Sequence, residues 1–505
     1  MTLRQVVVIG AGPAGMAAAE AALRAGAGVT LIDAAENPGG QYHRTLPDAY
    51  APAHPQRLTR DRRAFDRRRR LLLGHPRCTW WPETVVWALE RRDPDGTDGA
   101  PPPRVHLLHG PADGSGRRRS TVDPDALVLA VGAHDRVLPF PGWELPGVFT
   151  AGAAQALVKG ERVVVGDQVV VAGTGPFLLP VAAALAQAGA QVRAVLEANV
   201  PGTVVRGWSR RAGELAAHAA KALELAKYTA ELARHRVPYR FGRAVMAARG
   251  AGRVEEVVTA RLRADWSVVP GSERSAAVDA LCVSHGFSPQ LELPLAAGCA
   301  LRGRTPASPE GAFVAVDADQ RTSVPGVYAA GEITGIAGAP AARAEGTIAG
   351  WSAGGGSPGD AALRRVRRHR DQGRAFAARL ARAHPIGPAW PGWLEPQTVI
   401  CRCEETDYDQ LRRAVTHPAS ATARVAKLQT RAGLGPCQAR ICGPTVAELA
   451  ARLRAGPAEH PLQGLPSATP HHRPIAQPIR LGELAAPPAE HAAPTTAPAP
   501  TKESE

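Results

Sequence analysis

Val6-Val7-Val8-Ile9-Gly10-Ala11-Gly12-Pro13-Ala14-Gly15 is the stretch from which the architecture of this chain follows. It is typical of a buried strand, a glycine turn and the first residues of a helix. Gly10 permits the tight turn, Gly12 lets the backbone approach a pyrophosphate, and Gly15 lets the helix pack closely on the strand. The amide groups at the helix N-terminus, around Pro13 and Ala14, would then face the phosphates.

The next strand supports the same interpretation. An Ala-rich run leads to Val29-Thr30-Leu31-Ile32, and Asp33 follows directly, 23 residues beyond Gly10. A carboxylate at this place can accept hydrogen bonds from the ribose of an adenosine. The alternative is a glycine turn that serves only packing, because Gly and Ala are abundant in the chain. The order strand, turn, helix, strand favours a dinucleotide site.

Length and composition indicate a protein with several domains. The chain has 505 residues and an ordinary 45% of hydrophobic residues, so it can bury more than one core. No stretch reaches the run of about 18 apolar residues that a membrane helix needs. Arg4 and the apolar residues after it resemble a signal peptide, but the glycine loop interrupts that run. We expect a cytoplasmic protein, with any membrane contact peripheral or made through a partner.

The net charge of +14 comes almost entirely from arginine, which is clustered at residues 67–70, 117–119 and 364–370. Neither interleaved aromatic residues nor a recognition-helix pattern accompanies these clusters, so we expect no nucleic-acid partner. A solvated surface is the simplest interpretation, and attraction of an acidic redox partner is the second.

A near copy of the opening occurs in the middle of the chain. Val169-Val170-Val171-Ala172-Gly173-Thr174-Gly175-Pro176-Phe177-Leu178 repeats the strand and turn, and a second helix and strand follow it. Here Leu178 replaces the third glycine, and the acid, Glu197, comes one residue later than in the first copy. Gly173, Gly175 and Glu197 are therefore candidates for a second nucleotide site. The alternative is a retained fold that binds nothing.

Two further segments are expected to meet the first loop at a single flavin. Gly39-Gly40-Gln41 would lie close to the flavin, where larger side chains would obstruct it. A late strand ends in Ala329-Ala330-Gly331-Glu332, and its carboxylate would meet the ribityl chain. Gly40, Gln41, Gly331 and Glu332 are thus candidate cofactor contacts. This arrangement resembles the glutathione-reductase-like flavoproteins, which have two dinucleotide-binding domains.

Four of the seven cysteines form a pattern near the C-terminus. Cys401-Arg-Cys403 is followed after 33 residues by Cys437-Gln-Ala-Arg-Ile-Cys442. Four thiolates suit a [2Fe–2S] cluster, since its iron sites favour sulfur. Zinc and unliganded thiols are the alternatives, although structural zinc sites more often have gaps of two to four residues within each pair. The chain has no CxxC, so we do not expect dithiol exchange.

The resemblance extends to the domain order. The expected parts are a flavin domain (1–149 and 285–355), an inserted NAD(P)-binding-like domain (150–284), a linker (356–396), a [2Fe–2S] module (397–455) and a disordered tail (456–505). Within the linker we expect a basic helical stretch at residues 361–383, followed by a Pro/Trp-rich segment. The residues around the four cysteines are similar to the bacterioferritin-associated-ferredoxin type of [2Fe–2S] domain. The fold class is therefore α/β with a small C-terminal ferredoxin-type module.

The whole combination resembles the alpha (A or B) subunits of heteromeric bacterial amino-acid dehydrogenases. This family includes the A subunit of opine oxidase, the B subunit of hydrogen cyanide synthase and the alpha subunits of the hydroxyproline and proline dehydrogenases. The resemblance rests on Gly39-Gly40-Gln41-Tyr42, on Leu138-Pro-Phe-Pro-Gly-Trp143-Glu-Leu-Pro-Gly147, on Gly173-Thr-Gly-Pro176 and on Gly331-Glu-Ile-Thr-Gly-Ile-Ala-Gly338.

This resemblance implies an electron-transferring oxidoreductase subunit with FAD and a [2Fe–2S] cluster. A separate amine-oxidase-like flavin subunit would oxidise an amino acid or opine, a small ferredoxin-like subunit often completes such complexes, and a quinone-type acceptor would take the electrons. We therefore expect no catalytic residue in this chain, and His43, His134 and His285 are expected to be structural or to lie at the surface. The second loop stays open between NAD(P), another adenine nucleotide and no nucleotide. The alternative functions are a self-sufficient NAD(P)H-dependent reductase and a redox-sensing scaffold.

Overall fold

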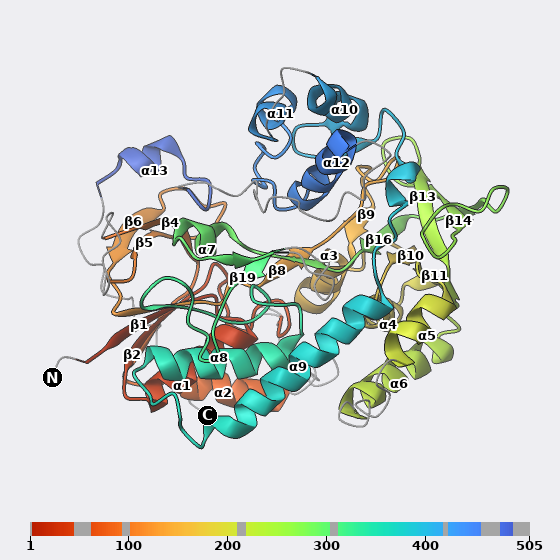
Figure 1. Ribbon diagram of the computed structural model, residues 1–505. Coiled ribbons are helices and arrows are strands. Elements are labelled where there is room, and N and C mark those ends of the chain that lie inside the picture. The colour runs from red at the N-terminus through yellow and green to blue at the C-terminus, as the bar shows by residue number, and fades with distance from the viewer. Residues whose placement is uncertain are drawn as a thin grey trace, which may run out of the picture.

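The computed structural model describes residues 3–44, 62–92, 101–209, 219–303, 312–417, 423–455 and 475–487. Figure 1 shows two α/β domains side by side and a small helical module that lies above them. The red and orange N-terminal strands belong to the first domain, and the yellow-green elements form the second.

The first domain is built on a five-stranded parallel sheet with the strand order β20-β7-β1-β2-β3. Helices cover one face of this sheet, and a three-stranded antiparallel sheet with one short helix covers the other. Because both faces are covered, the central strands are continuous apolar runs. The elements are β1 (Gln5–Ile9), α1 (Pro13–Arg24), β2 (Gly28–Ile32), α2 (Arg62–Leu73), β3 (Cys78–Trp81), β4 (Thr84–Glu90), β5 (Arg104–His109), β6 (Arg118–Val122), β7 (Ala126–Leu129), α7 (Glu292–Ala296), β18 (Leu301–Arg302), β19 (Phe313–Val314), β20 (Val327–Ala329) and α8 (Ala339–Ala353).

The second domain repeats this architecture. Its parallel sheet has the order β9-β16-β10-β11-β12, which corresponds strand for strand to that of the first domain, and it is again covered by helices on one face and an antiparallel sheet on the other. The internal repeat predicted from the two glycine loops is thus present as a whole-domain repeat. The elements are β9 (Val148–Thr150), α3 (Ala151–Ala156), η3 (Leu157–Glu161), β10 (Gln168–Gly173), α4 (Leu178–Gln187), β11 (Gln191–Glu197), α5 (Pro201–Ser209), α6 (Ala219–Arg234), β12 (Tyr239–Phe241), β13 (Arg243–Arg249), β14 (Glu256–Arg261), β15 (Arg274–Ala277) and β16 (Ala280–Ser284).

A two-stranded antiparallel ribbon joins the two domains. It pairs β8 (Ala133–Asp135) with β17 (Phe287–Pro289), so the chain passes into the second domain on one strand and returns on the other. His285 lies buried at this junction, where its Nδ1 accepts a hydrogen bond from the Leu138 amide at 3.2 Å. Burial, with the charge of Arg136 beside it, lowers the pKa of His285 to about 3. The buried position and the hydrogen bond to the backbone favour a structural role for this histidine.

Helices α1 and α8 touch through their backbones. A Cβ atom added to Gly346 would lie 2.0 Å from the Ala14 carbonyl oxygen, and one added to Gly350 would lie 1.9 Å from that of Ala18. These two glycines, four residues apart on one face of α8, therefore allow a close approach that any side chain would prevent. The partners advance together along both helices, so the helices are parallel and their N-termini lie at the same edge of the sheet.

The helical stretch predicted at residues 361–383 forms a long helix, α9 (Leu363–Ala383), and the Pro/Trp-rich segment after it contains a short one, η5 (Trp390–Trp393), before the module begins. Figure 1 shows α9 crossing from α8 toward the second domain. The module consists of β21 (Val399–Cys401), β22 (Thr406–Asp407), α10 (Tyr408–Thr416), α11 (Ala423–Thr430) and α12 (Gly443–Ala455).

The predicted disordered tail differs from the structure within residues 475–487, the part of it that is described. Helix α13 (Leu481–Ala485) is held there by Arg117, whose Nε and Nη2 donate to both carboxylate oxygens of Glu483 at 2.8 and 2.9 Å. Ala476 packs into the core of the first domain. Contacts between such distant residues leave no local pattern in the sequence. The rest of the predicted tail lies outside the described residues.

Among the residues that the structure describes, no helix is both long enough and apolar enough to cross a membrane.

The contact between α1 and α8 gives a stability prediction. Alanine at position 350 should force the helices apart, so we expect Gly350→Ala to lower the free energy of unfolding by about 1–3 kcal/mol although alanine favours helix formation. Urea denaturation followed by circular dichroism measures this. Gly359→Ala is the control, because its added Cβ has no neighbour within 4 Å. Equal denaturation midpoints for the two variants would contradict the close contact.

The buried His285 predicts a pH dependence of stability. Its pKa of about 3 in the folded protein lies below its ordinary value of 6.5, so between these values only the unfolded chain takes up the proton. Its contribution is therefore complete above pH 6.5 and is lost as the pH falls, by at most about 1.4 kcal/mol per pH unit. We expect a shallower loss between pH 7 and pH 5 in His285→Asn, measured by urea denaturation. The exposed His235→Asn should keep the slope of the unmodified protein, and parallel curves for all three proteins would refute this assignment.

Candidate functional site

The first glycine loop has the shape that a dinucleotide site requires. Gly10 has a φ of +96°, and a Cβ at Gly15 would lie 1.7 Å from the Gly10 carbonyl oxygen, so the turn and the start of α1 need glycine at both positions. Gly12 is different, because a Cβ added there would meet nothing within 4 Å. Helix α1 begins immediately afterwards at Pro13. The open side of Gly12 thus adjoins a helix N-terminus, which favours a phosphate group.

Asp33 closes this loop from the tip of β2. Its Oδ2 accepts a hydrogen bond from the Ala11 amide at 2.5 Å, and its Oδ1 accepts one from the Ala35 amide at 2.8 Å. Burial raises the pKa of Asp33, and these amides act in the opposite direction. The residue remains partly exposed, and each oxygen has a lone pair beyond its amide partner. Asp33 can therefore accept ribose hydroxyls as well.

The second predicted segment lies against the first. The Gly39 amide donates to the Ala11 carbonyl at 2.8 Å, and a Cβ added to Gly40 would come within 2.9 Å of the Gly12 Cα. Gln41 is exposed next to this contact, and its Oε1 accepts a hydrogen bond from Arg44 at 2.7 Å. The structure thus packs Gly40 against the first loop, with Gln41 exposed beside it.

The third segment reaches the same edge. Gly331 has a φ of +83°, and a Cβ there would lie 2.9 Å from that of Ala14, the second residue of α1. Glu332 follows, partly exposed, and α8 begins after Gly338, another glycine with open space beside it. The N-termini of α1 and α8 and the three predicted segments therefore converge at one edge of the sheet. This arrangement fits an FAD, although each residue's contact with it stays a prediction.

Sequence reasoning missed the residue that organises the third segment. Glu345 of α8 is buried, and its Oε2 accepts hydrogen bonds from the Gly331 amide at 2.9 Å and the Thr334 hydroxyl at 2.6 Å. Its Oε1 accepts one from Arg374 of α9 at 2.8 Å. The only signal in the sequence is a single carboxylate within a helix otherwise rich in Ala and Gly.

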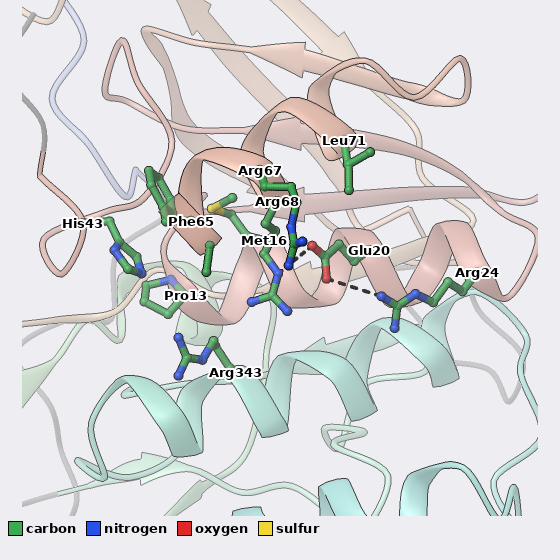
Figure 2. Close-up of a pocket in the computed structure, with 11 residues that line it drawn as sticks. Pro13, Met16, Glu20, Arg24, His43, Phe65, Arg67, Arg68, Leu71 and Arg343 are labelled. Carbon is green, nitrogen blue, oxygen red and sulfur yellow. Dashed lines mark ion pairs between the residues drawn. The ribbon is translucent and has the colours of Figure 1, made fainter. Parts of the chain in front are cut away.

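A basic pocket of about 310 Å³ opens beside α1 (Figure 2). Glu20 lies at its edge, 2.7 Å from Nε of Arg68 and 3.8 Å from Nη2 of Arg24. The positively charged side chains in its lining come from α1, α2 and α8, so part of the arginine cluster at residues 67–70 faces this pocket. Its lining residues are Pro13, Met16, Glu20, Arg24, His43, Ala64, Phe65, Arg67, Arg68, Leu71 and Arg343.

The second glycine loop keeps the turn but differs around it. Gly173 has a φ of +141°, and a Cβ there would lie 1.7 Å from the Ser284 carbonyl oxygen, so this turn again requires glycine. Gly175, like Gly12, has open space where a Cβ would stand. Helix α4 does not follow directly, however, but begins at Leu178, which is fully buried.

The acid of the second copy is enclosed. The Glu197 side chain is 0% exposed, and its Oε2 accepts hydrogen bonds from the Gly175 amide at 2.8 Å and from His384 Nδ1 at 3.1 Å. Its Oε1 accepts from the Thr174 hydroxyl at 2.8 Å and from the Asn199 amide at 2.9 Å. Burial alone would raise the pKa of Glu197, but these hydrogen bonds, above all that of His384, outweigh it and lower the pKa. Glu197 is therefore a buried, ionised carboxylate.

The four C-terminal cysteines come together in the module. Cys442 hydrogen-bonds both Cys401 and Cys437, and Cys437 is also hydrogen-bonded to Cys403. A Cβ added to Gly435 would lie 2.3 Å from that of Cys403, so the loop needs glycine beside the sulfurs. Among the described residues, no three His, Cys, Asp or Glu side chains meet the geometry of a single-ion site.

Hydrogen bonds prepare two of these thiols to lose their protons. Cys442 lowers the pKa of Cys401 to about 6, and the amides of Gly433, Glu404 and Cys403 add to this effect against the cost of burial. Cys442 likewise lowers the pKa of Cys437, to about 5. A thiolate is the form of cysteine that binds a metal.

The other three cysteines are outside this group. Burial raises the pKa of Cys78 to about 11, of Cys282 to about 12 and of Cys299 to about 11, so these thiols stay protonated and unreactive.

Two buried ion pairs hold the module against the rest of the chain. Arg440, between Cys437 and Cys442, lies 3.1 Å from Glu292 of α7. Its Nη2 also donates to the Ala476 carbonyl at 2.8 Å. Glu448 of α12 accepts from Arg136, next to the interdomain ribbon, at 2.9 Å. Neither contact could be predicted, because each joins residues more than 140 positions apart.

Fold and site together define an FAD-dependent oxidoreductase with an iron–sulfur module. A model of the pyridine nucleotide-disulphide oxidoreductase family matches residues 4–346, and a model of the BFD-like [2Fe-2S] binding domain matches residues 399–452. The predicted cofactors, FAD and a [2Fe–2S] cluster, are thereby confirmed.

Known proteins resemble the whole chain. The A subunit of opine oxidase from Rhizobium meliloti is 31% identical over 502 residues, which are 95% of this chain and 87% of that protein. Hydrogen cyanide synthase subunit HcnB of Pseudomonas aeruginosa is 31% identical over 476 residues, covering 91% and 94%. The crystal structure of L-proline dehydrogenase from P. horikoshii shares the fold, with a TM-score of 0.62 and 18% identity over 96% of this chain and 81% of that one.

The chain belongs to the pyridine nucleotide-disulphide oxidoreductase family, among the relatives of HcnB and of the opine oxidase A subunits. The resemblance inferred from the glycine, proline and cysteine motifs is therefore confirmed.

The cysteine assignment can be tested directly. We expect Cys437→Ser to lose most of the visible absorbance and bound iron of the cluster while the FAD spectrum stays unchanged, because serine is a poor ligand for these irons. Absorbance, iron analysis and flavin content measure this in the purified protein. Cys78→Ser is the control and should keep both spectra. Recovery of zinc in place of iron from the unmodified protein would contradict the assignment.

Proposed function

We propose that this chain is the FAD and [2Fe–2S] electron-transfer subunit of a heteromeric dehydrogenase that oxidises an amino acid or opine. It would take electrons from a partner flavin subunit and pass them to a quinone-type acceptor. The relatives support this proposal, since HcnB and its opine oxidase counterpart are both named as subunits of enzymes.

The observation that carries the proposal is the attachment of the cysteine loop to the flavin domain. Arg440 stands between two cluster ligands and pairs with Glu292, and both side chains are about 10% exposed or less. A buried ion pair of this kind fixes an orientation more than it adds stability. The module is thus held in one position relative to the domain that would bind FAD.

The chemistry needs both groups. Bound FAD accepts a pair of electrons, and a [2Fe–2S] cluster passes them on singly. This chain's residues contribute binding and orientation: Gly12 leaves room for the pyrophosphate, Asp33 accepts ribose hydroxyls, and Glu345 shapes the loop at Gly331. The oxidation of the carbon–nitrogen bond would take place on an amine-oxidase-like partner, and a small ferredoxin-like subunit would complete the complex. The cytoplasmic location stays a prediction.

The test uses the complex of this chain with its amine-oxidase-like partner. After anaerobic mixing with opines or amino acids such as proline, hydroxyproline and glycine, we expect the electron paramagnetic resonance signal of a reduced cluster. In Cys437→Ser the partner's flavin should still bleach, but this signal should be absent.

Two outcomes would replace the proposal. Rapid reduction of the cluster by NADH in the isolated chain would favour a self-sufficient NAD(P)H-dependent reductase. Absence of turnover with every substrate, in an intact complex with both cofactors, would favour a redox-sensing scaffold.

A further inference from the structure

The second dinucleotide fold differs from the first at its acid, where an adenosine ribose would bind. Asp33 is partly exposed and has one amide on each oxygen. Glu197 has no exposed surface, and a second donor from Asn199, Nδ2 at 3.1 Å, adds to the four already described. Tyr239 also hydrogen-bonds this carboxylate. A carboxylate offers about four lone-pair sites, so Glu197 has none left for a ribose.

The donor that closes this site comes from outside the second domain. His384 follows the last turn of α9, and its side chain is only 9% exposed. Helix α5 holds it there: a Cβ added to Gly207 would lie 2.3 Å from the Ala383 Cα, and the Trp208 ring packs against Phe376 of α9. The end of α9 therefore covers the tip of β11, on the side where a dinucleotide would enter.

The pyrophosphate end of the second loop is also altered. Helix α4 begins three residues after Gly175, and the amides of Leu178 and Leu179 donate to the carbonyl oxygens of Gly175 and Pro176. These amides are thus used within the turn, whereas α1 starts directly after Gly12. The second loop offers fewer donors to a phosphate.

The chain that follows His384 continues the closure. Trp266 of the second domain is fully buried, and its Nε1 donates to Asn199 at 3.3 Å. Its ring stacks on Trp393 with centroids 5.6 Å apart, and a Cβ at Gly387 would lie 2.2 Å from it. One hydrophobic core then runs from the second domain into the module, through Leu138, Ala198, Leu262, Trp266, Trp390, Trp393, Ile400, Leu411 and Leu449.

We infer that the second dinucleotide fold binds no nucleotide, because His384 occupies the carboxylate of Glu197. The fold serves instead as the surface on which the [2Fe–2S] module packs. The packing of α9 and the tryptophans uses the space and the hydrogen-bonding groups that a cofactor would need. This inference does not depend on which substrate the complex oxidises. It also removes the path by which NAD(P)H would reduce the chain.

The first experiment is calorimetric titration of the FAD-loaded protein with NADH, NADPH and ADP. We expect no saturable binding up to about 1 mM, the upper end of usual KM values. Gly175→Asn is the reference variant, because asparagine tolerates a positive φ such as the +94° of Gly175 and its side chain would stand in the open space at the second loop. Saturable binding that this variant abolishes, with an unchanged flavin spectrum, would overturn the inference. Binding that survives in the variant would lie elsewhere and leave the inference standing.

The second experiment tests the packing of the module on the second domain. We expect His384→Ala to speed hydrogen exchange of the amides at residues 385–400 by about tenfold or more, because a hydrogen bond to a buried charge is lost. The cluster's visible circular dichroism should change while the FAD absorbance stays. His235→Ala is the matched control, since this histidine pairs with Glu231 at the same 3.1 Å but on the surface of the second domain.

If the alanine variant does not fold, His384→Gln carries the comparison, because its amide can still donate to Glu197. We then expect hydrogen-exchange rates at residues 385–400 that lie between the rates of the unmodified protein and those expected when the hydrogen bond to Glu197 is lost. Exchange rates equal to those of the control would show that the placement of the module does not depend on the contact between His384 and Glu197, and the inference would fail.

Discussion

The backbone contact between α1 and α8 is the constraint on which the flavin domain depends. Gly346 and Gly350 let the two helices approach until Ala14 and Ala18 carbonyls fill the space of a missing side chain. Because the helices are parallel, their N-termini meet at the carboxyl edge of the sheet, where two sets of unpaired amides favour one anionic cofactor. Glu345 of α8 then holds the loop at Gly331 on the same edge.

The same loop, used twice, shows how a fold can keep its backbone and change its role. Gly10 and Gly173 are both required by their turns, and both acids hydrogen-bond an amide of their own loop. What differs is the surroundings of each acid: Asp33 stays partly exposed, whereas His384, at the end of α9, hydrogen-bonds Glu197. The presence of a dinucleotide motif therefore establishes a fold, and the neighbours of its acid decide whether a ligand can bind.

The fold was largely predictable because its signals are local. Glycine spacing, apolar strands and the CxC and CxxxxC pairs each lie within a few residues, and they predicted the two dinucleotide folds, the module and the three segments that meet at one edge of the sheet. Glu345, His384 and Arg440 could not be found in this way, since each acts on a residue or group brought near by folding. The helix at Leu481–Ala485 was missed for the same reason, because its partner Arg117 is more than 360 positions away.

The need to hold the module in one position explains why its contacts with the two α/β domains are ionic as well as apolar. The hydrophobic effect is non-directional, whereas electron transfer needs a fixed separation between the two cofactors. Arg440 with Glu292 and Arg136 with Glu448 are buried pairs, for which losing one partner costs about 3–5 kcal/mol, so each strongly disfavours any other placement. Arg440 lies between Cys437 and Cys442, the cysteines that we expect to bind the cluster, so its pair with Glu292 would also fix the position of the cluster. The second domain supplies the rest of the surface on which the module packs. This role explains why the domain is retained although its acid, Glu197, is not available to bind a ribose.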